Sequence, residues 1–178
     1  MFTDGRSKKV VFVAHCLLNQ NSISDGTAVY PAAFKDIINL FMYNDVGIVQ
    51  LPCPELCCLG LDRGNVYGAD SEVTVENTRI RREMEKSETQ QKLKALVDYT
   101  MLQIDEYTKH GFEIKGIIGA NRSPNCGVET TSDNDVETGG KGVFMTALAE
   151  EIAKRGLSIP MTGIKGSDNI TEKLKKFL

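Results

Sequence analysis

The sequence lacks any apolar run long enough to cross a membrane. A transmembrane helix needs ~20 apolar residues in succession, and no segment of the 178 residues comes near that length. The first nine residues are polar, and the apolar run that follows them is shorter than the roughly 7–15 residues at the centre of a signal peptide. We therefore expect a cytoplasmic protein with no membrane partner.

A strong charge of either sign is also missing. The chain has 21 basic and 24 acidic residues, for a net charge of −3, and such a balance does not attract nucleic acid by bulk charge. We expect neither a DNA nor an RNA partner, whereas a homodimer stays open. At roughly 150 residues per domain, the length predicts a single domain over residues 1–178.

Cysteine pairs with the C-x-x-C spacing are absent as well. Five cysteines are an odd number for a disulfide framework, and cytoplasmic thiols stay reduced. Structural zinc sites use four ligands in pairs such as C-x-x-C, and this chain has no such pair. Cys57 and Cys58 are adjacent, which is poor geometry for chelating one metal, and we interpret them as packing residues.

What the sequence does contain is a regular alternation of strand and helix patterns. Short β-rich apolar runs predict strands, and apolar residues at helical spacing predict helices between them. The pattern is typical of an α/β fold, and we expect one Rossmann-like domain in which a mostly parallel sheet of about four strands carries helices on both faces. The predicted strands are 9–14, 46–51, 114–120 and 158–164; the predicted helices are 34–41, 77–110 with a break near Ser87, 143–155 and 170–177.

Two long polar segments, 56–75 and 121–142, are predicted to be irregular loops. Loops of this length in a compact domain are often functional. The second ends in the glycine-rich stretch 139–142 just before a predicted helix, where a phosphate can bind.

Three cysteines follow three of the predicted strands. Cys16 comes two residues after the first strand, Cys53 follows the second, and Cys126 lies six residues after the third. Ligands of open α/β sheets bind at the carboxyl ends of the strands, so we expect these thiols near one another. Cysteine sulfur selects zinc, copper(I) or iron–sulfur clusters, and three ligands on a four-iron cluster leave one iron open. Buried structural cysteine is the commoner interpretation of thiols at such spacing.

The residues around these cysteines form three motifs. The first is Cys16-Leu17-Leu18 followed by Asp25-Gly26, the second is Cys53-Pro54-Glu55 followed by Leu59-Gly60 and Arg63, and the third is Ser123-Pro124-Asn125-Cys126-Gly127. In this order they resemble the 2-thiouracil desulfurase (TudS-like desulfidase) family, and the resemblance runs over residues 10–157.

The resemblance implies a function for five of these residues. Family members hold a 4Fe–4S cluster on three cysteines, which match Cys16, Cys53 and Cys126, and the open iron binds the substrate sulfur. Glu55 and Ser123 match the residues implicated in catalysis, where a carboxylate near the cluster can act as general base on water. The implied reaction is the non-redox removal of sulfur from a small thiolated base or nucleotide, which gives the oxo base and sulfide.

The chain departs from the family pattern near the expected substrate. Asn19 stands where the family usually has glycine, and Asn125 stands where serine is common. We expect Asn19, Asn21, Arg63 and Asn125 to contact the substrate, by reading a base edge or an anion.

Two other functions stay open on the sequence alone. Without a cluster, Cys126 would be a nucleophilic thiolate partnered by Glu55 or His15, as in a cysteine-dependent hydrolase or transferase. Alternatively, a metal on the same cysteines would make the protein a regulator or carrier without enzymatic activity.

Overall fold

Four short strands form one parallel sheet in the computed structural model, which describes residues 2–178. Their order is β2-β1-β3-β6, and every neighbouring pair is parallel. The central strand β1 is almost wholly buried, as expected for a strand covered on both faces. The strands are β1 (Lys9–Val13), β2 (Gly47–Gln50), β3 (Glu113–Ala120) and β6 (Met161–Ile164).

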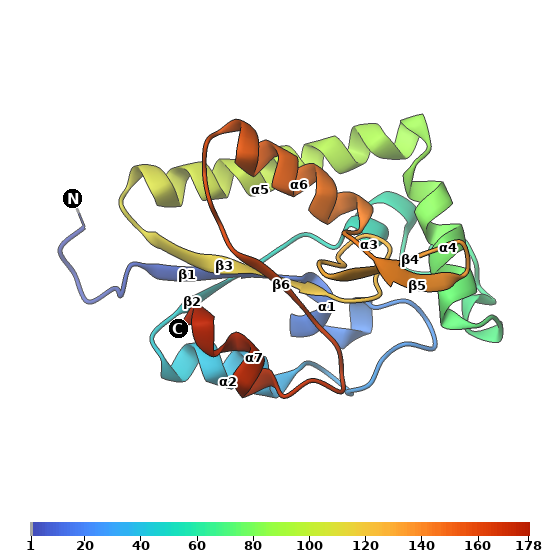
Figure 1. Ribbon diagram of the computed structural model, residues 1–178, viewed down its shortest axis with the longest axis horizontal. Helices are drawn as coiled ribbons and strands as arrows, with labels where there is room; N and C mark the ends of the chain where they lie inside the picture. The colour runs from blue at the N-terminus through green and yellow to red at the C-terminus, as the bar shows by residue number, and fades with distance from the viewer. Residues whose placement is uncertain (1) are drawn as a thin grey trace.

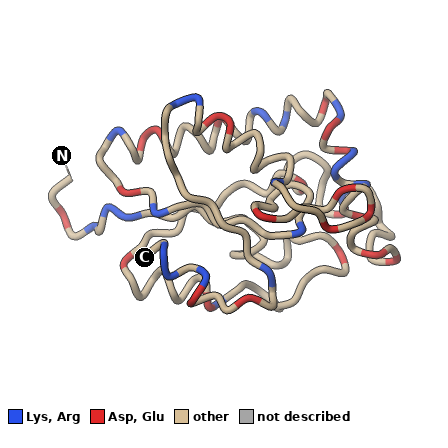
Figure 2. Tube along the Cα trace, viewed as in Figure 1, with Lys and Arg blue, Asp and Glu red and all other residues tan. Residues whose placement is uncertain are grey.

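Helices cover both faces of this sheet (Figure 1). One layer consists of α5 (Ser87–Lys109) and α6 (Val143–Lys154), and the other of α2 (Lys35–Tyr43) and α7 (Ile170–Leu174). The side chains of Phe12, Ile117 and Phe144 are fully buried between these layers. Residues of both charge signs are interspersed along the two layers (Figure 2). The α/β class, the parallel four-stranded sheet and the helices on both faces are thus confirmed.

The remaining elements gather beyond the carboxyl ends of the strands (Figure 1). They are α1 (His15–Leu18), α3 (Pro54–Leu59), α4 (Val73–Met84) and a separate antiparallel hairpin of β4 (Thr130–Asp133) and β5 (Val136–Gly139). Short 3-10 turns lie at Gln20–Ser22, Gly68–Asp70 and Lys175–Phe177. In residues 2–178, no helix combines the length and the apolar character needed to cross a bilayer.

The first predicted loop, 56–75, is wrong at both ends. Helix α3 occupies its beginning, because Pro54 stands at the first helical position and the sulfur of Cys53 caps the helix by accepting the N–H of Leu56 at 3.5 Å. Helix α4 begins at Val73, four residues before the predicted start at 77. The predicted break near Ser87 is confirmed, since α5 starts at that residue.

The second predicted loop, 121–142, is wrong over its middle part, which forms the β4–β5 hairpin. Asn134 and Asp135 connect the two strands with φ of 50° and 64°. Positive φ at both central positions is typical of a type I′ turn, whose twist matches that of a hairpin. Strand β6 also begins three residues later than predicted, after Pro160, which has no N–H to donate to the sheet.

Candidate functional site

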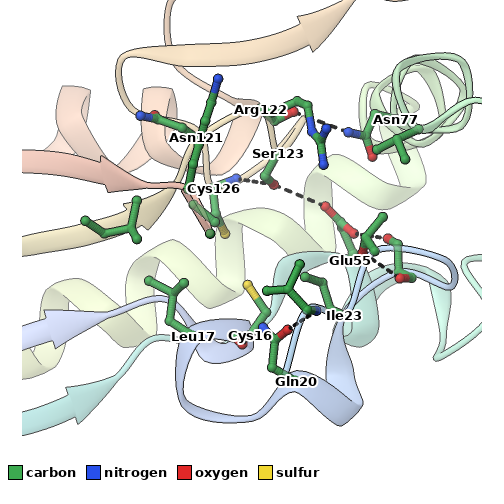
Figure 3. A pocket seen from close by; sticks show the side chains of 18 of the residues that line it. Cys16, Leu17, Gln20, Ile23, Glu55, Asn77, Asn121, Arg122, Ser123 and Cys126 are labelled. Carbon is green, nitrogen blue, oxygen red and sulfur yellow. Dashed lines mark hydrogen bonds between the residues drawn. The ribbon is translucent and has the colours of Figure 1, made fainter. Parts of the chain in front are cut away.

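The sheet order places a crevice at the carboxyl end of β1. From β1 the sheet extends to β2 on one side and to β3 on the other, and ligands of open α/β sheets bind where the strand order reverses in this way. A cavity of about 360 Å³ opens at that edge. Its wall includes Cys16, Cys53, Glu55, Ser123 and Cys126, which the sequence places in three separate loops. Figure 3 shows four of these residues, Cys16, Glu55, Ser123 and Cys126.

The three cysteines therefore meet at one cavity. Cys16 lies in α1 just after β1, Cys53 is the cap of α3, and Cys126 follows β3. All three are free thiols; Cys53 and Cys126 are buried, whereas Cys16 is half-buried. Within residues 2–178, no three His, Cys, Asp or Glu side chains converge closely enough to bind a single metal ion.

As free thiols these groups are held in their neutral form. Burial, together with the neighbouring Cys53 and Glu55, raises the pKa of Cys16 to about 12. Burial and Glu55 raise the pKa of Cys53 to about 11. The pKa of Cys126 is raised well above its ordinary value by burial and by the other two thiols. The cavity thus disfavours free thiolates, and a metal or cluster that bound these sulfurs would have to displace their protons.

Glu55 is the carboxylate of this cavity, and four side chains hold it in place. Its Oε1 accepts the amide of Asn125 at 3.0 Å and the hydroxyl of Ser123 at 3.5 Å. Its Oε2 accepts Ser24 Oγ at 3.1 Å and Arg63 Nε at 3.2 Å. The Ser123 contact is the longest of the four, so it is the position that a water or substrate can most easily take.

Arg63 is buried to 3% exposure and binds protein groups with all three nitrogens of its guanidinium. Nε pairs with Glu55, Nη1 donates to the carbonyl of Leu61, and Nη2 donates to the carbonyl of Ser22. Nη2 also lies 3.8 Å from the sulfur of Cys53. Arg63 lines the cavity as predicted. Its nitrogens connect the first two cysteine loops and pair with Glu55.

Replacing Arg63 with methionine is expected to lower the free energy of unfolding by about 3–5 kcal/mol, because the change leaves Glu55 charged and buried without its partner. Urea titration of the cluster-free protein measures this loss. In the Glu55→Gln background the same replacement is expected to cost clearly less. An equal cost in both backgrounds would contradict the ion-pair explanation and assign the stability to the carbonyl contacts.

Ser123 organises the loop that carries Cys126. Its Oγ accepts the N–H of Cys126 at 2.9 Å and the N–H of Asn125 at 3.2 Å. These two bonds occupy the acceptor positions of the hydroxyl, so its own proton is directed toward Glu55 (Figure 3). Gly127 completes the turn, since a β-carbon there would collide with the carbonyl of Thr130.

A second polar clamp on this loop was not predicted. The Oδ1 of Asn121 accepts the N–H groups of Val128, Glu129 and Thr130 at 3.1–3.3 Å. Its Nδ2 donates to Glu129, whose carboxylate also accepts the hydroxyl of Thr162. Asn121 directly follows β3, and a polar residue at a strand's carboxyl end was the signal available in the sequence.

The other three residues expected to contact the substrate do not line the cavity. Asn19 and Asn21 do not line the cavity; the side chain of Asn19 caps a 3-10 turn by accepting Asn21 N at 3.1 Å. Asn125 is fully buried behind Glu55. His15 does not line the cavity either, and its Nδ1 lies 2.9 Å from the amide of Gln50.

The amino end of α6, where the sequence would allow a phosphate to bind, is covered by the Cys126 loop. The N–H of Val143 donates to the carbonyl of Pro124 at 2.9 Å, and that of Met145 donates to the carbonyl of Asn125 at 3.1 Å. These amides are therefore used to fix the loop and are not directed at a ligand.

The comparisons with known proteins identify no family or function. A protein of Methanocaldococcus jannaschii described as uncharacterized is 27% identical over 154 residues, which cover 86% of this chain and 84% of that protein. No model of a known protein family matches the sequence. No solved structure matches it.

Proposed function

We propose that this protein is an iron–sulfur-dependent desulfidase that removes sulfur from a small thiolated base or nucleotide without net oxidation or reduction. The observation that carries the proposal is the meeting of Cys16, Cys53 and Cys126 at one cavity whose wall also contains Glu55 and Ser123. The three motifs that resemble the 2-thiouracil desulfurase family supply exactly these five positions in three loops, which the fold brings together.

The donor set suits a cluster of several irons better than a single ion. Three sulfurs are soft ligands of the kind that iron–sulfur clusters use, and they surround the cavity without converging on one point. Cys16, Cys53 and Cys126 would hold a 4Fe–4S cluster. When bound, it supplies a soft Lewis acid for the substrate sulfur at the iron that no cysteine occupies.

Residues of the chain itself would activate the attacking water and accept its proton. The carbon–sulfur bond breaks with its electron pair on sulfur, and a carbon–oxygen bond forms to water, so the products are the oxo compound and sulfide. Glu55 would take a proton from the attacking water at Oε1, where the long Ser123 contact leaves room. Ser123 would stay between this carboxylate and the loop of Cys126 and keep the two in register.

The alternative of a Cys126 nucleophile is less well supported. A nucleophilic cysteine needs a lowered pKa or an adjacent base, whereas burial and two neighbouring thiols raise the pKa of Cys126. His15, one of its suggested partners, does not line the cavity.

A metal-binding regulator would retain the cluster but would release no sulfide. The proposal includes a cytoplasmic location, where the five free cysteines would stay reduced.

The test uses protein purified and reconstituted with iron and sulfide without oxygen, and 2-thiouracil as the probe. We expect one sulfide to be released for each oxo ring formed, with no added reductant. In ¹⁸O-labelled water each product ring should contain one ¹⁸O atom. A reconstituted protein that releases no sulfide from thiouracils or thionucleotides would contradict the proposal, and so would a strict need for an electron donor.

A further inference from the structure

Asn77 of α4 lines the cavity with one polar atom that no protein group uses. The residue is only 7% exposed. Its Nδ2 donates to the carbonyl of Arg122 at 3.3 Å and to Ser132 Oγ at 3.1 Å. Its Oδ1 accepts no hydrogen bond from any residue in the described range 2–178, and the side chain forms part of the cavity wall.

The orientation of this amide follows from its neighbours. The hydroxyl of Ser132 donates to the carbonyl of Arg122 at 2.7 Å, so its only hydrogen is already used. It can therefore only accept from Asn77, and the group that faces it must be the NH₂ end. Figure 3 shows the amide nitrogen turned toward Arg122 and the oxygen on the other side of the amide.

The oxygen is not among the fully enclosed polar atoms that lack a partner, so water can occupy its acceptor position in the free protein. A ligand that brings an N–H can take the place of that water. Two other residues expected to contact the substrate are hydrogen-bonded to protein groups. Arg63 binds protein carbonyls and Glu55, and Asn125 donates to Glu55. Asn77 thus offers an acceptor in the cavity, whereas Arg63 and Asn125 direct donors to protein groups.

We propose that Oδ1 of Asn77 accepts a hydrogen bond from a ring N–H of the thiolated substrate. This inference rests on the proposed desulfidase function and assigns Asn77 as a residue that selects rings with a free N–H beside the thiocarbonyl. Rings alkylated at that nitrogen would be disfavoured, because they displace the water at the amide oxygen without supplying a donor in its place.

The test compares the binding of 2-thiouracil with that of its 1-methyl and 3-methyl derivatives. Binding is measured calorimetrically on oxygen-free reconstituted protein in the Glu55→Gln background, in which turnover is expected to be too slow to consume the ring. We expect 2-thiouracil to bind about five-fold more tightly than one of the two methylated rings, the size of one neutral hydrogen bond. In Asn77→Leu that preference should fall to about one-fold.

Two further variants separate hydrogen bonding from structural disturbance. Ser132→Ala removes a partner of the NH₂ group but keeps Oδ1, and Asn77→Asp keeps an acceptor oxygen; both should retain the preference. A disturbed cavity would weaken all three rings equally and leave their ratio unchanged. The Asn77→Asp result also decides the question if Asn77→Leu fails to fold, because a lost preference there would overturn the inference.

The outcomes distinguish this inference from the proposed function. Sulfide release by the wild type with an unchanged preference in Asn77→Leu would overturn the role of Asn77 alone. A preference that depends on Asn77 without any sulfide release by the wild type would support the contact and overturn the desulfidase function. Failure of all three rings to bind would overturn both.

Discussion

Protein purified without oxygen is expected to contain about four iron atoms and about four acid-labile sulfides per chain, and Cys16→Ser, Cys53→Ser or Cys126→Ser should each lose most of both. The three sulfurs come from three loops around one cavity, so two remaining cysteines would hold the cluster from only two sides. Iron and sulfide analysis, together with the visible absorption spectrum, measures the loss. The triple serine variant should contain neither element.

Cys57 provides a matched control for these variants. It lies in α3, one helical turn after Cys53, but it is exposed and does not line the cavity. Cys57→Ser is therefore expected to retain the full iron and sulfide content. Loss of the cluster in Cys57→Ser, or one zinc ion in place of iron in the wild type, would contradict the assignment of the three ligands.

The variants should also remain folded, because each serine replaces one thiol in a cavity wall and leaves the sheet untouched. The buried core includes Cys126 but consists mainly of apolar side chains of the sheet and its helices. Circular dichroism of the cluster-free variants should match that of cluster-free wild type. This comparison separates the loss of a ligand from the loss of the fold.

The positions of the cysteines relative to the strands were predictable from local patterns. Strands buried on both faces are continuous apolar runs, and such runs precede Cys16 and Cys126. Because parallel strands end at the same edge of a sheet, three local predictions were enough to bring the thiols to one cavity. The hairpin was missed because β4 and β5 are short and polar, with no apolar alternation to mark them.

The hydrogen-bond partners of the polar side chains in the site were not predictable, because these partners lie far away in the chain. The bond from Arg63 to the Ser22 carbonyl spans 41 residues, and the bond from Asn125 to Glu55 spans 70. A sequence motif identifies both residues as part of the site, but only the fold shows whether their donors face a ligand or the protein. For the same reason Asn77, which lies outside every motif, was not predicted.

Glu55→Gln is expected to lower the rate of sulfide release by a factor of about 10²–10⁴, the usual contribution of a general base, while iron content stays at the wild-type level. Glutamine has nearly the same shape and keeps an oxygen for the donors on one side, although its NH₂ group would face the donors on the other. It cannot take a proton from water. Because Glu55 touches no cysteine sulfur among its hydrogen-bond partners, the effect should fall on turnover and leave the cluster intact.

Glu113→Gln serves as the control for this change. Glu113 is an exposed carboxylate at the start of β3, at the opposite end of that strand from the cavity, and it pairs with Lys115 at 2.8 Å. Its replacement should leave sulfide release unchanged.

If Glu55→Gln released sulfide as fast as the wild type, the proton would have to go to another group, and Glu55 would be a positioning residue for Ser24, Arg63 and Asn125. A lower iron content in the same variant would instead show that Glu55 supports the cysteine loops, because its four donors come from all three of them.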